Sequence, residues 1–137
     1  MLKKIVRFYL PIIIWGVLIY SISNTSVPQV STAYVVDFTA HKFAHIVEYA
    51  ILAILLYRAL KEEEINKLEA VIYAIIITAF YGFTDEYHQS FTAGRTTRLR
   101  DVIFDTIGAG IGLLIIWKLL PKAPKKLSNL AKKLDLI

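Results

Sequence analysis

Four apolar stretches dominate this chain of 137 residues, at about 5–23, 43–60, 68–84 and 102–120. Each is close to the ~20 residues that a helix needs to cross ~30 Å of hydrocarbon. The helices of a soluble four-helix bundle, which is the alternative, would each carry a polar stripe at the 3.6-residue helical period. Residues 12–20 and 70–83 contain no charged side chain and show no such stripe. The sequence therefore predicts an all-α integral membrane bundle of four transmembrane helices, formed as a single domain by residues 1–120.

The composition agrees with a membrane protein and removes several kinds of chemistry. Apolar residues make up 56% of the chain and charged residues 20%, and the mean hydropathy is +0.54. A soluble domain has roughly 45–50% apolar and about 25% charged residues. The chain has no cysteine, which excludes disulfides, thiolate metal sites and a cysteine nucleophile. It also has no G-x-S-x-G motif and no glycine-rich phosphate loop.

The basic residues are distributed unevenly between the two sides of the predicted membrane. We expect the first stretch to remain as a helix, because no small-x-small pattern ending in alanine follows Tyr20. Twelve lysines and arginines then lie on one side, and Lys42, Arg95, Arg98 and Arg100 lie on the other. The positive-inside rule predicts a multi-pass protein of the cell membrane with both termini in the cytoplasm.

Residues 121–137 form a basic cytoplasmic tail in this topology. Leu127, Leu130, Ala131 and Leu134 recur at helical spacing, with lysines between them. This pattern is typical of an amphipathic helix that lies on an anionic inner leaflet. A frayed basic tail is an equally good interpretation. Nucleic acid is not an expected partner, because no aromatic residues are interleaved with the lysines.

Polar side chains collect at the opposite, extracytoplasmic ends of the helices. All three histidines and six of the eleven acidic residues lie there. Ionisable groups within a membrane are costly and usually face a bundle interior or a wet cavity, where they pair with one another. Three sets of residues each share a helical face: His41, His45 and Glu48; Tyr81, Asp85 and His88; and Asp101, Asp105, Gly108 and Gly112. We therefore expect a polar pocket at the outer membrane boundary, built by the second, third and fourth helices.

Gly108 and Gly112 form a small-xxx-small pair, which lets another helix approach closely. We interpret the pair as a helix-packing motif, acting within the chain or between the subunits of a homo-oligomer.

Basic side chains beside the acids favour an anionic ligand. A guanidinium group matches the geometry of phosphate and carboxylate, and at this depth the natural anion is a lipid headgroup or a lipid-linked envelope precursor. We expect Arg95 to hold the anion, assisted by Lys42 and Arg98. The other residues expected to shape the binding site are His45, Glu48, Tyr49, Asp85, Glu86, His88, Gln89, Asp101 and Asp105.

The alternative function is a membrane hydrolase or transferase that acts on a lipid-linked phosphate or ester. Here His45 or His88 would be the general base, and the acid or metal ligand would be one of the carboxylates Glu48, Asp85 and Glu86. Transport is disfavoured, because polar residues occur only at the outer helix ends and transporters place their sites near the midplane.

A divalent metal is left open and is not favoured. His41 and His45 have the spacing of two ligands on one helix, and Glu48 or Asp85 would complete a zinc site, but no H-E-x-x-H motif is present. The purely structural interpretation pairs Asp105 with Arg95 or Arg98, and Glu48 with Lys42 or an arginine.

Two segments carry a family likeness. They read His41-Lys-Phe-Ala-His45-Ile-Val-Glu48-Tyr49, and Thr84-Asp85-Glu86-Tyr-His88-Gln89-Ser-Phe91-Thr-Ala-Gly94-Arg95 followed by Asp101-Val-Ile-Phe-Asp105-Thr-Ile-Gly108 and Gly112. Over residues 42–112 the chain resembles the VanZ-like family of small bacterial membrane proteins. The matching positions are Lys42, His45, Glu48, Tyr49, Asp85, Glu86, His88, Gln89, Gly94, Arg95, Asp101, Asp105 and Gly108. Ala93 departs from the family pattern, which commonly has proline there, and His41 lies outside the shared core.

The resemblance implies a multi-pass cell-membrane protein linked to the envelope. The founding member is associated with resistance to the glycopeptide teicoplanin, so an influence on glycopeptide susceptibility is a further expectation. The resemblance supplies no reaction.

Overall fold

Four long helices make up most of the molecule, as the apolar stretches predict. The computed structural model describes residues 1–24, 33–91 and 99–136, and these residues contain no strand. Each of the four helices is long and apolar enough to cross a membrane. In chain order the elements are α1 (Leu2–Lys4), η1 (Ile5–Tyr9) and α2 (Leu10–Ser23), which form the first span; α3 (Tyr34–Glu62); α4 (Lys67–Gln89); α5 (Leu99–Leu114), η2 (Ile115–Leu119) and η3 (Leu120–Lys122), which form the fourth span; and α6 (Lys125–Lys133).

The helices extend beyond the apolar stretches that predict them. α3 begins at Tyr34 instead of residue 43, and α4 continues to Gln89 instead of residue 84. Hydropathy marks where side chains change from apolar to polar, whereas a helix continues for as long as its backbone hydrogen bonds and packing favour it. The described residues of the predicted polar site therefore lie on helices.

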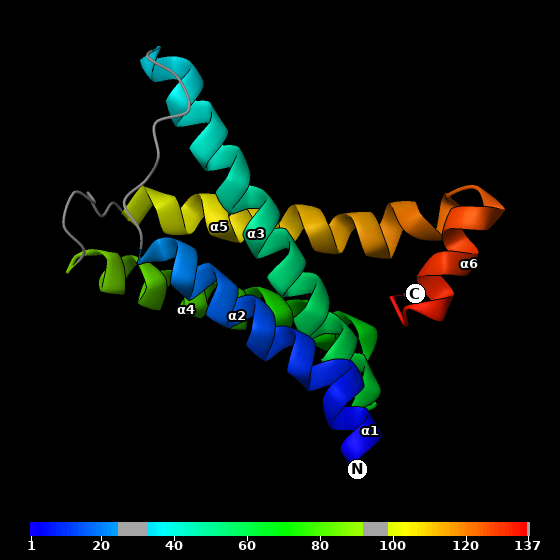
Figure 1. The fold of residues 1–137 in the computed structure, drawn as a ribbon. Helices are drawn as coiled ribbons and strands as arrows, with labels where there is room; N and C mark the ends of the chain where they lie inside the picture. The colour runs from blue at the N-terminus through cyan, green and yellow to red at the C-terminus, as the bar shows by residue number, and fades with distance from the viewer. Residues whose placement is uncertain (25–32, 92–98, 137) are drawn as a thin grey trace.

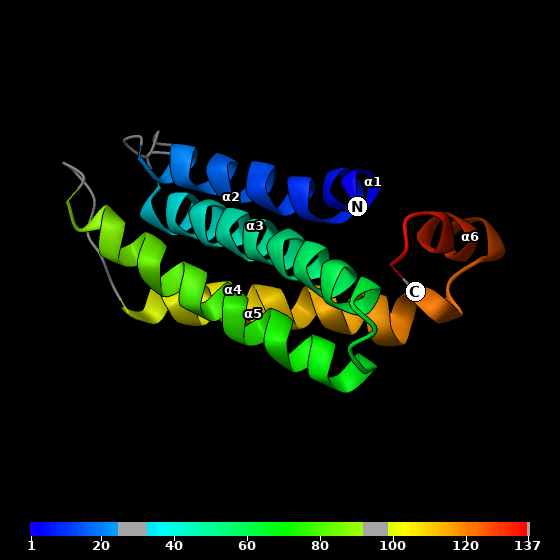
Figure 2. The same cartoon turned by 90° about the horizontal axis from the view of Figure 1, so that it is seen from below.

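α3 is the central helix of the bundle. It contacts α2 on one side and α4 and α5 on the other, and it crosses α5 at a large angle in Figure 1. Figure 2 shows the same arrangement, with α2 in an outer layer above α3. The core between α3, α4 and α5 contains small side chains, among them Ala53, Ala70, Ala74 and Ala109, which allow close helix approach.

Two glycines set the separation of α3 and α5. A Cβ atom placed on Gly108 would lie 2.4 Å from the carbonyl oxygen of Ile46, and one on Gly112 would lie 2.9 Å from the carbonyl oxygen of Ala50. Because both neighbours are backbone atoms of α3, neither can move aside without moving the helix. The glycine pair thus packs two helices of the same chain against each other.

Both termini lie at the same end of the bundle. The Lys4 Nζ atom is 3.0 Å from Glu63 in the α3–α4 turn, and the Arg7 guanidinium is 2.5 Å from Asp135 beyond α6. The α3–α4 turn ends at Asn66, whose side chain accepts a hydrogen bond of 2.9 Å from the backbone N–H of Glu69 and caps α4.

Two π-helical segments, η1 and η2, also lie at this end, and each ends two residues before a proline. Pro11 and Pro121 lack the N–H that a regular α-helix would use one turn back, and a proline ring clashes with the carbonyl four residues earlier. The wider π turn relieves that clash. α6 follows Pro124 as a regular helix, and the side chains of Leu127, Leu130 and its C-cap residue Leu134 are about half exposed.

Candidate functional site

An ion pair and a histidine–carboxylate pair join α3 to α5 at the end opposite the termini. The Lys42 ammonium lies 2.6 Å from Asp101, and both side chains are mostly buried. One turn further along, Nδ1 of His45 lies 3.0 Å from Oδ1 of Asp105, a carboxylate that is almost fully buried. Pairing lowers the cost of burying charge, which is otherwise high within a membrane.

A second set of hydrogen bonds connects α3 to α4. The Tyr49 hydroxyl donates to Oδ2 of Asp85 at 3.2 Å, and the Gln89 amide donates to the same oxygen at 2.8 Å. The Tyr49 side chain is completely buried, and Asp85 is 6% exposed. One turn of α4 thus presents a carboxylate whose orientation is fixed by a tyrosine from another helix.

One buried oxygen of this network has no hydrogen-bond partner. Among the described residues, nothing donates to Oδ1 of Asp85. An unpaired buried carboxylate oxygen costs free energy, so such an atom is a candidate acceptor for a ligand donor or a water. Gly82 lies between the two sets of bonds: a Cβ there would be 3.0 Å from Oδ2 of Asp105. The absence of a side chain at Gly82 therefore brings Asp105 close to α4.

The first helix also contributes to this end of the bundle, which the sequence analysis missed. Nε2 of His88 lies 3.3 Å from the side-chain oxygen of Asn24, and the rings of His88 and Tyr20 are 4.6 Å apart. The indole N–H of Trp15 donates to the backbone carbonyl of Glu48 at 2.9 Å. The only signal in the sequence was the polar Asn24 at the end of an otherwise apolar stretch.

We can now place the predicted site residues. Those that the structure brings together at this end are Lys42, His45, Glu48, Tyr49, Asp85, Glu86, His88, Gln89, Asp101 and Asp105. Arg95 and Arg98 lie outside the described residues. Asp105 pairs with His45, and Lys42 pairs with Asp101. The pairing of Asp105 with Arg95 or Arg98 stays a prediction, because neither arginine is among the described residues. We refer to Lys42, His45, Tyr49, Asp85, Gln89, Asp101 and Asp105 as the polar cluster.

The described part of the molecule shows no metal centre. Within residues 1–24, 33–91 and 99–136, no group of three histidine, aspartate or glutamate side chains is arranged to hold a metal ion. His45 instead directs one ring nitrogen at Asp105. This arrangement orients the imidazole and leaves Nε2 as the nitrogen for any proton transfer.

A comparison with protein families gives one result that covers most of the chain. The family model VanZ/LLP1 matches residues 5–120, which include nearly all of the four spans and the whole polar cluster. No curated protein and no solved structure gives a match. The family match and the four apolar helices together indicate a multi-pass membrane protein, and the chain belongs to the VanZ-like family.

Proposed function

We propose that this chain is an envelope protein of the cell membrane that binds the headgroup of an anionic lipid or a lipid-linked envelope precursor. The observation that carries the proposal is the polar cluster, which three helices build at one end of the bundle from charged and hydrogen-bonding groups. Such groups are retained at this depth only at a cost, and they usually mark a site. The basic ends of the helices and both termini would then be cytoplasmic, which places the cluster on the outer side.

The chemistry of the cluster suits a headgroup that carries hydroxyl groups as well as negative charge. The carboxylates of Asp85, Asp101 and Asp105 are hydrogen-bond acceptors, and Oδ1 of Asp85 is unoccupied by any described donor. Sugar or glycerol hydroxyls are matching donors. The negative part of the ligand would pair with Arg95 and Arg98, with Lys42 and Arg100 nearby on α3 and α5. By holding such a ligand the protein would influence glycopeptide susceptibility.

Native mass spectrometry of the full chain, extracted gently from its own membrane, tests this proposal. We expect one anionic lipid per protein, lost in Arg95→Ala and retained in Lys61→Ala, which removes a positive charge at the other end of α3. Circular dichroism of both variants checks that the helices are intact. Equal lipid retention by Arg95→Ala and the unchanged protein would refute the headgroup site.

The alternative, a hydrolase or transferase, is favoured by one observation. Asp105 holds Nδ1 of His45, as a carboxylate does in an acid–base pair, so that Nε2 is free to accept a proton from a nucleophile such as water. Incubation of the pure protein with lipid-linked phosphates and esters tests this function. Product that forms with the unchanged protein and is lost in His45→Gln would support it, and absence of product from both proteins would refute it.

A further inference from the structure

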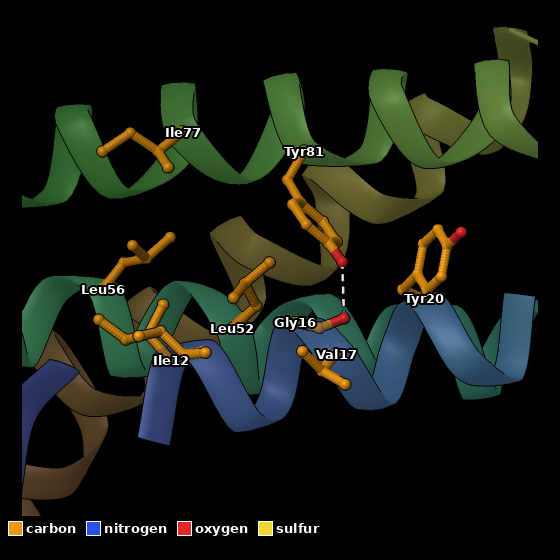
Figure 3. Close-up of a pocket in the computed structure, with 9 residues that line it drawn as sticks. Ile12, Gly16, Val17, Tyr20, Leu52, Leu56, Ile77 and Tyr81 are labelled. Carbon is orange, nitrogen blue, oxygen red and sulfur yellow. Dashed lines mark hydrogen bonds between the residues drawn. The ribbon is translucent and has the colours of Figure 1, made fainter. Parts of the chain in front are cut away.

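An apolar groove runs along the membrane-spanning part of the bundle between α2 and α4, with α3 as its floor (Figure 3). Its larger part has a volume of about 420 Å³, and a second hollow of about 290 Å³ continues it toward the termini. The two share Ile12, Ile13, Leu56 and Ile77. The groove exists because α2 packs on α3 and contacts α4 only slightly.

The lining of the groove offers nothing to a polar ligand over most of its length. Most of the wall consists of aliphatic side chains of α2, α3 and α4, with Tyr20 and Tyr81 at one end (Figure 3) and Tyr9 and Glu63 at the other. The Tyr81 hydroxyl already donates to the backbone carbonyl of Gly16 at 2.7 Å. A groove of this composition, inside segments that span a bilayer, matches a hydrocarbon chain.

The length of the groove fits one lipid chain. From Tyr20 to Tyr9 the groove follows α2 for about 16 Å, at 1.5 Å per residue. One leaflet contributes about half of the ~30 Å hydrocarbon core, so this length is close to that of one acyl chain.

One end of the groove adjoins the polar cluster. Tyr81 lines the groove, and its ring lies 6.3 Å from that of Tyr49, which donates to Asp85. Tyr20 lines the same end and lies against His88. A lipid whose headgroup is held at the polar cluster would therefore find the mouth of the groove beside it, with its chain pointing toward the termini.

We propose that the groove between α2 and α4 binds one acyl or isoprenoid chain of the lipid whose headgroup occupies the polar cluster. The inference rests on the proposed function and adds to it the ligand class: a lipid recognised by both its headgroup and its chain. The inference also gives α2 a role. This helix carries no residue of the polar cluster, and it would enclose the chain.

The probes are two phosphatidylglycerols with a diazirine on one acyl chain, near the headgroup in one and at the chain end in the other. The full chain is reconstituted into vesicles that contain either probe, irradiated, and analysed by peptide mapping. We expect the first probe to label peptides around Tyr20 and Tyr81, and the second to label those around Tyr9 and Leu60. Uniform labelling of all lipid-exposed helix faces by both probes would refute the proposal that the groove binds a lipid chain.

Matched tryptophan substitutions provide the control. Ile77→Trp fills the groove, whereas Ile76→Trp places the same side chain on the neighbouring lipid-facing position; the two isoleucines are 43% and 58% exposed. Val17→Trp and Ile14→Trp repeat the comparison on α2, where both residues are more than half exposed. We expect groove labelling to be lost in Ile77→Trp and Val17→Trp and kept in their controls. Unchanged labelling in both groove variants would refute the proposal.

The same probes separate this inference from the headgroup site. A phosphatidylcholine with the same diazirine chain presents the chain without net negative charge. If the groove binds chains but the headgroup site fails, both lipids label the groove equally and Ile77→Trp abolishes both signals. If the headgroup site holds but the groove fails, Arg95→Ala still lowers lipid retention while Ile77→Trp has no effect.

Discussion

Replacement of Gly108 by alanine should force α3 and α5 apart. The added Cβ would lie 2.4 Å from the Ile46 carbonyl oxygen, whereas ordinary contacts begin at 3.4 Å, so the helices must separate by about 1 Å. A rigid shift of that size would stretch the 3.0 Å bond between His45 and Asp105 to about 4 Å, beyond hydrogen-bonding distance. Overpacking costs about 1–3 kcal/mol and a lost charged hydrogen bond about 1.5–3 kcal/mol. We expect a net loss of about 2–4 kcal/mol, part of the strain being relieved by relaxation.

Two other glycines of α5 provide graded controls. Nothing lies within 4 Å of a Cβ placed on Gly110, so Gly110→Ala should stabilise the helix by about 0.5–1 kcal/mol. The stability of Gly112→Ala should lie between those of Gly108→Ala and Gly110→Ala, because the added Cβ meets Ala50 at 2.9 Å or more. Unfolding in mixed micelles with increasing dodecyl sulfate, followed by the fluorescence of Trp117 at the edge of the core, measures all three variants. Equal stability of Gly108→Ala and Gly110→Ala would refute the close contact of α3 and α5.

Three further predictions test other contacts. Asp105→Ala should lower the stability by about 1–3 kcal/mol, because it leaves a ring nitrogen of the mostly buried His45 without its hydrogen-bond partner. Asp105→Asn should lower the stability by less, because the amide oxygen still accepts; the same micelle assay compares the two variants. Asp135→Ala should release α6, so that its backbone amides exchange with deuterium faster while those of α3 do not; unchanged exchange would refute the anchoring role of this carboxylate. Hydrogen bonds from Tyr9 and Lys4 lower the pKa of Glu63 below 4.5, so that their stabilising effect is complete above that pH and is lost as the pH falls through the lowered pKa. Carboxyl NMR should find this pKa, and Lys4→Ala should raise it.

The four spans followed from hydropathy, because a continuous apolar stretch near the length of a bilayer has few other stable structures. The positions of the polar residues on their helix faces also followed from the sequence, because the helical period fixes which residues share a face. The sequence did not predict which residues these polar side chains pair with. The helical period indicates which way Asp105 points but not which helix lies opposite, so its contact with His45 could not be predicted from the sequence.

The part played by the first helix was harder still to predict. Aromatic residues near the end of a membrane helix are usually interface anchors, so Trp15 and Tyr20 gave no sign in the sequence of contacts with the other helices. Their contacts with Glu48 and His88 depend on the angle at which α2 meets α3. That angle follows from side-chain packing across the whole interface, which no single-residue pattern encodes. The groove likewise results from the gap that α2 leaves beside α4.

The close packing of α3 on α5 has a consequence for how a ligand would be recognised. The two helices run in the same direction, and their contacts advance in step, from Lys42 with Asp101, through Ile46 with Gly108, to Ala50 with Gly112. Because backbone meets backbone at the glycines, neither helix can slide or rotate to suit an incoming molecule. The pairs at the polar end are therefore preorganised: little conformational entropy would remain to be lost on binding, and selectivity among the proposed lipids would rest on complementarity to a fixed shape.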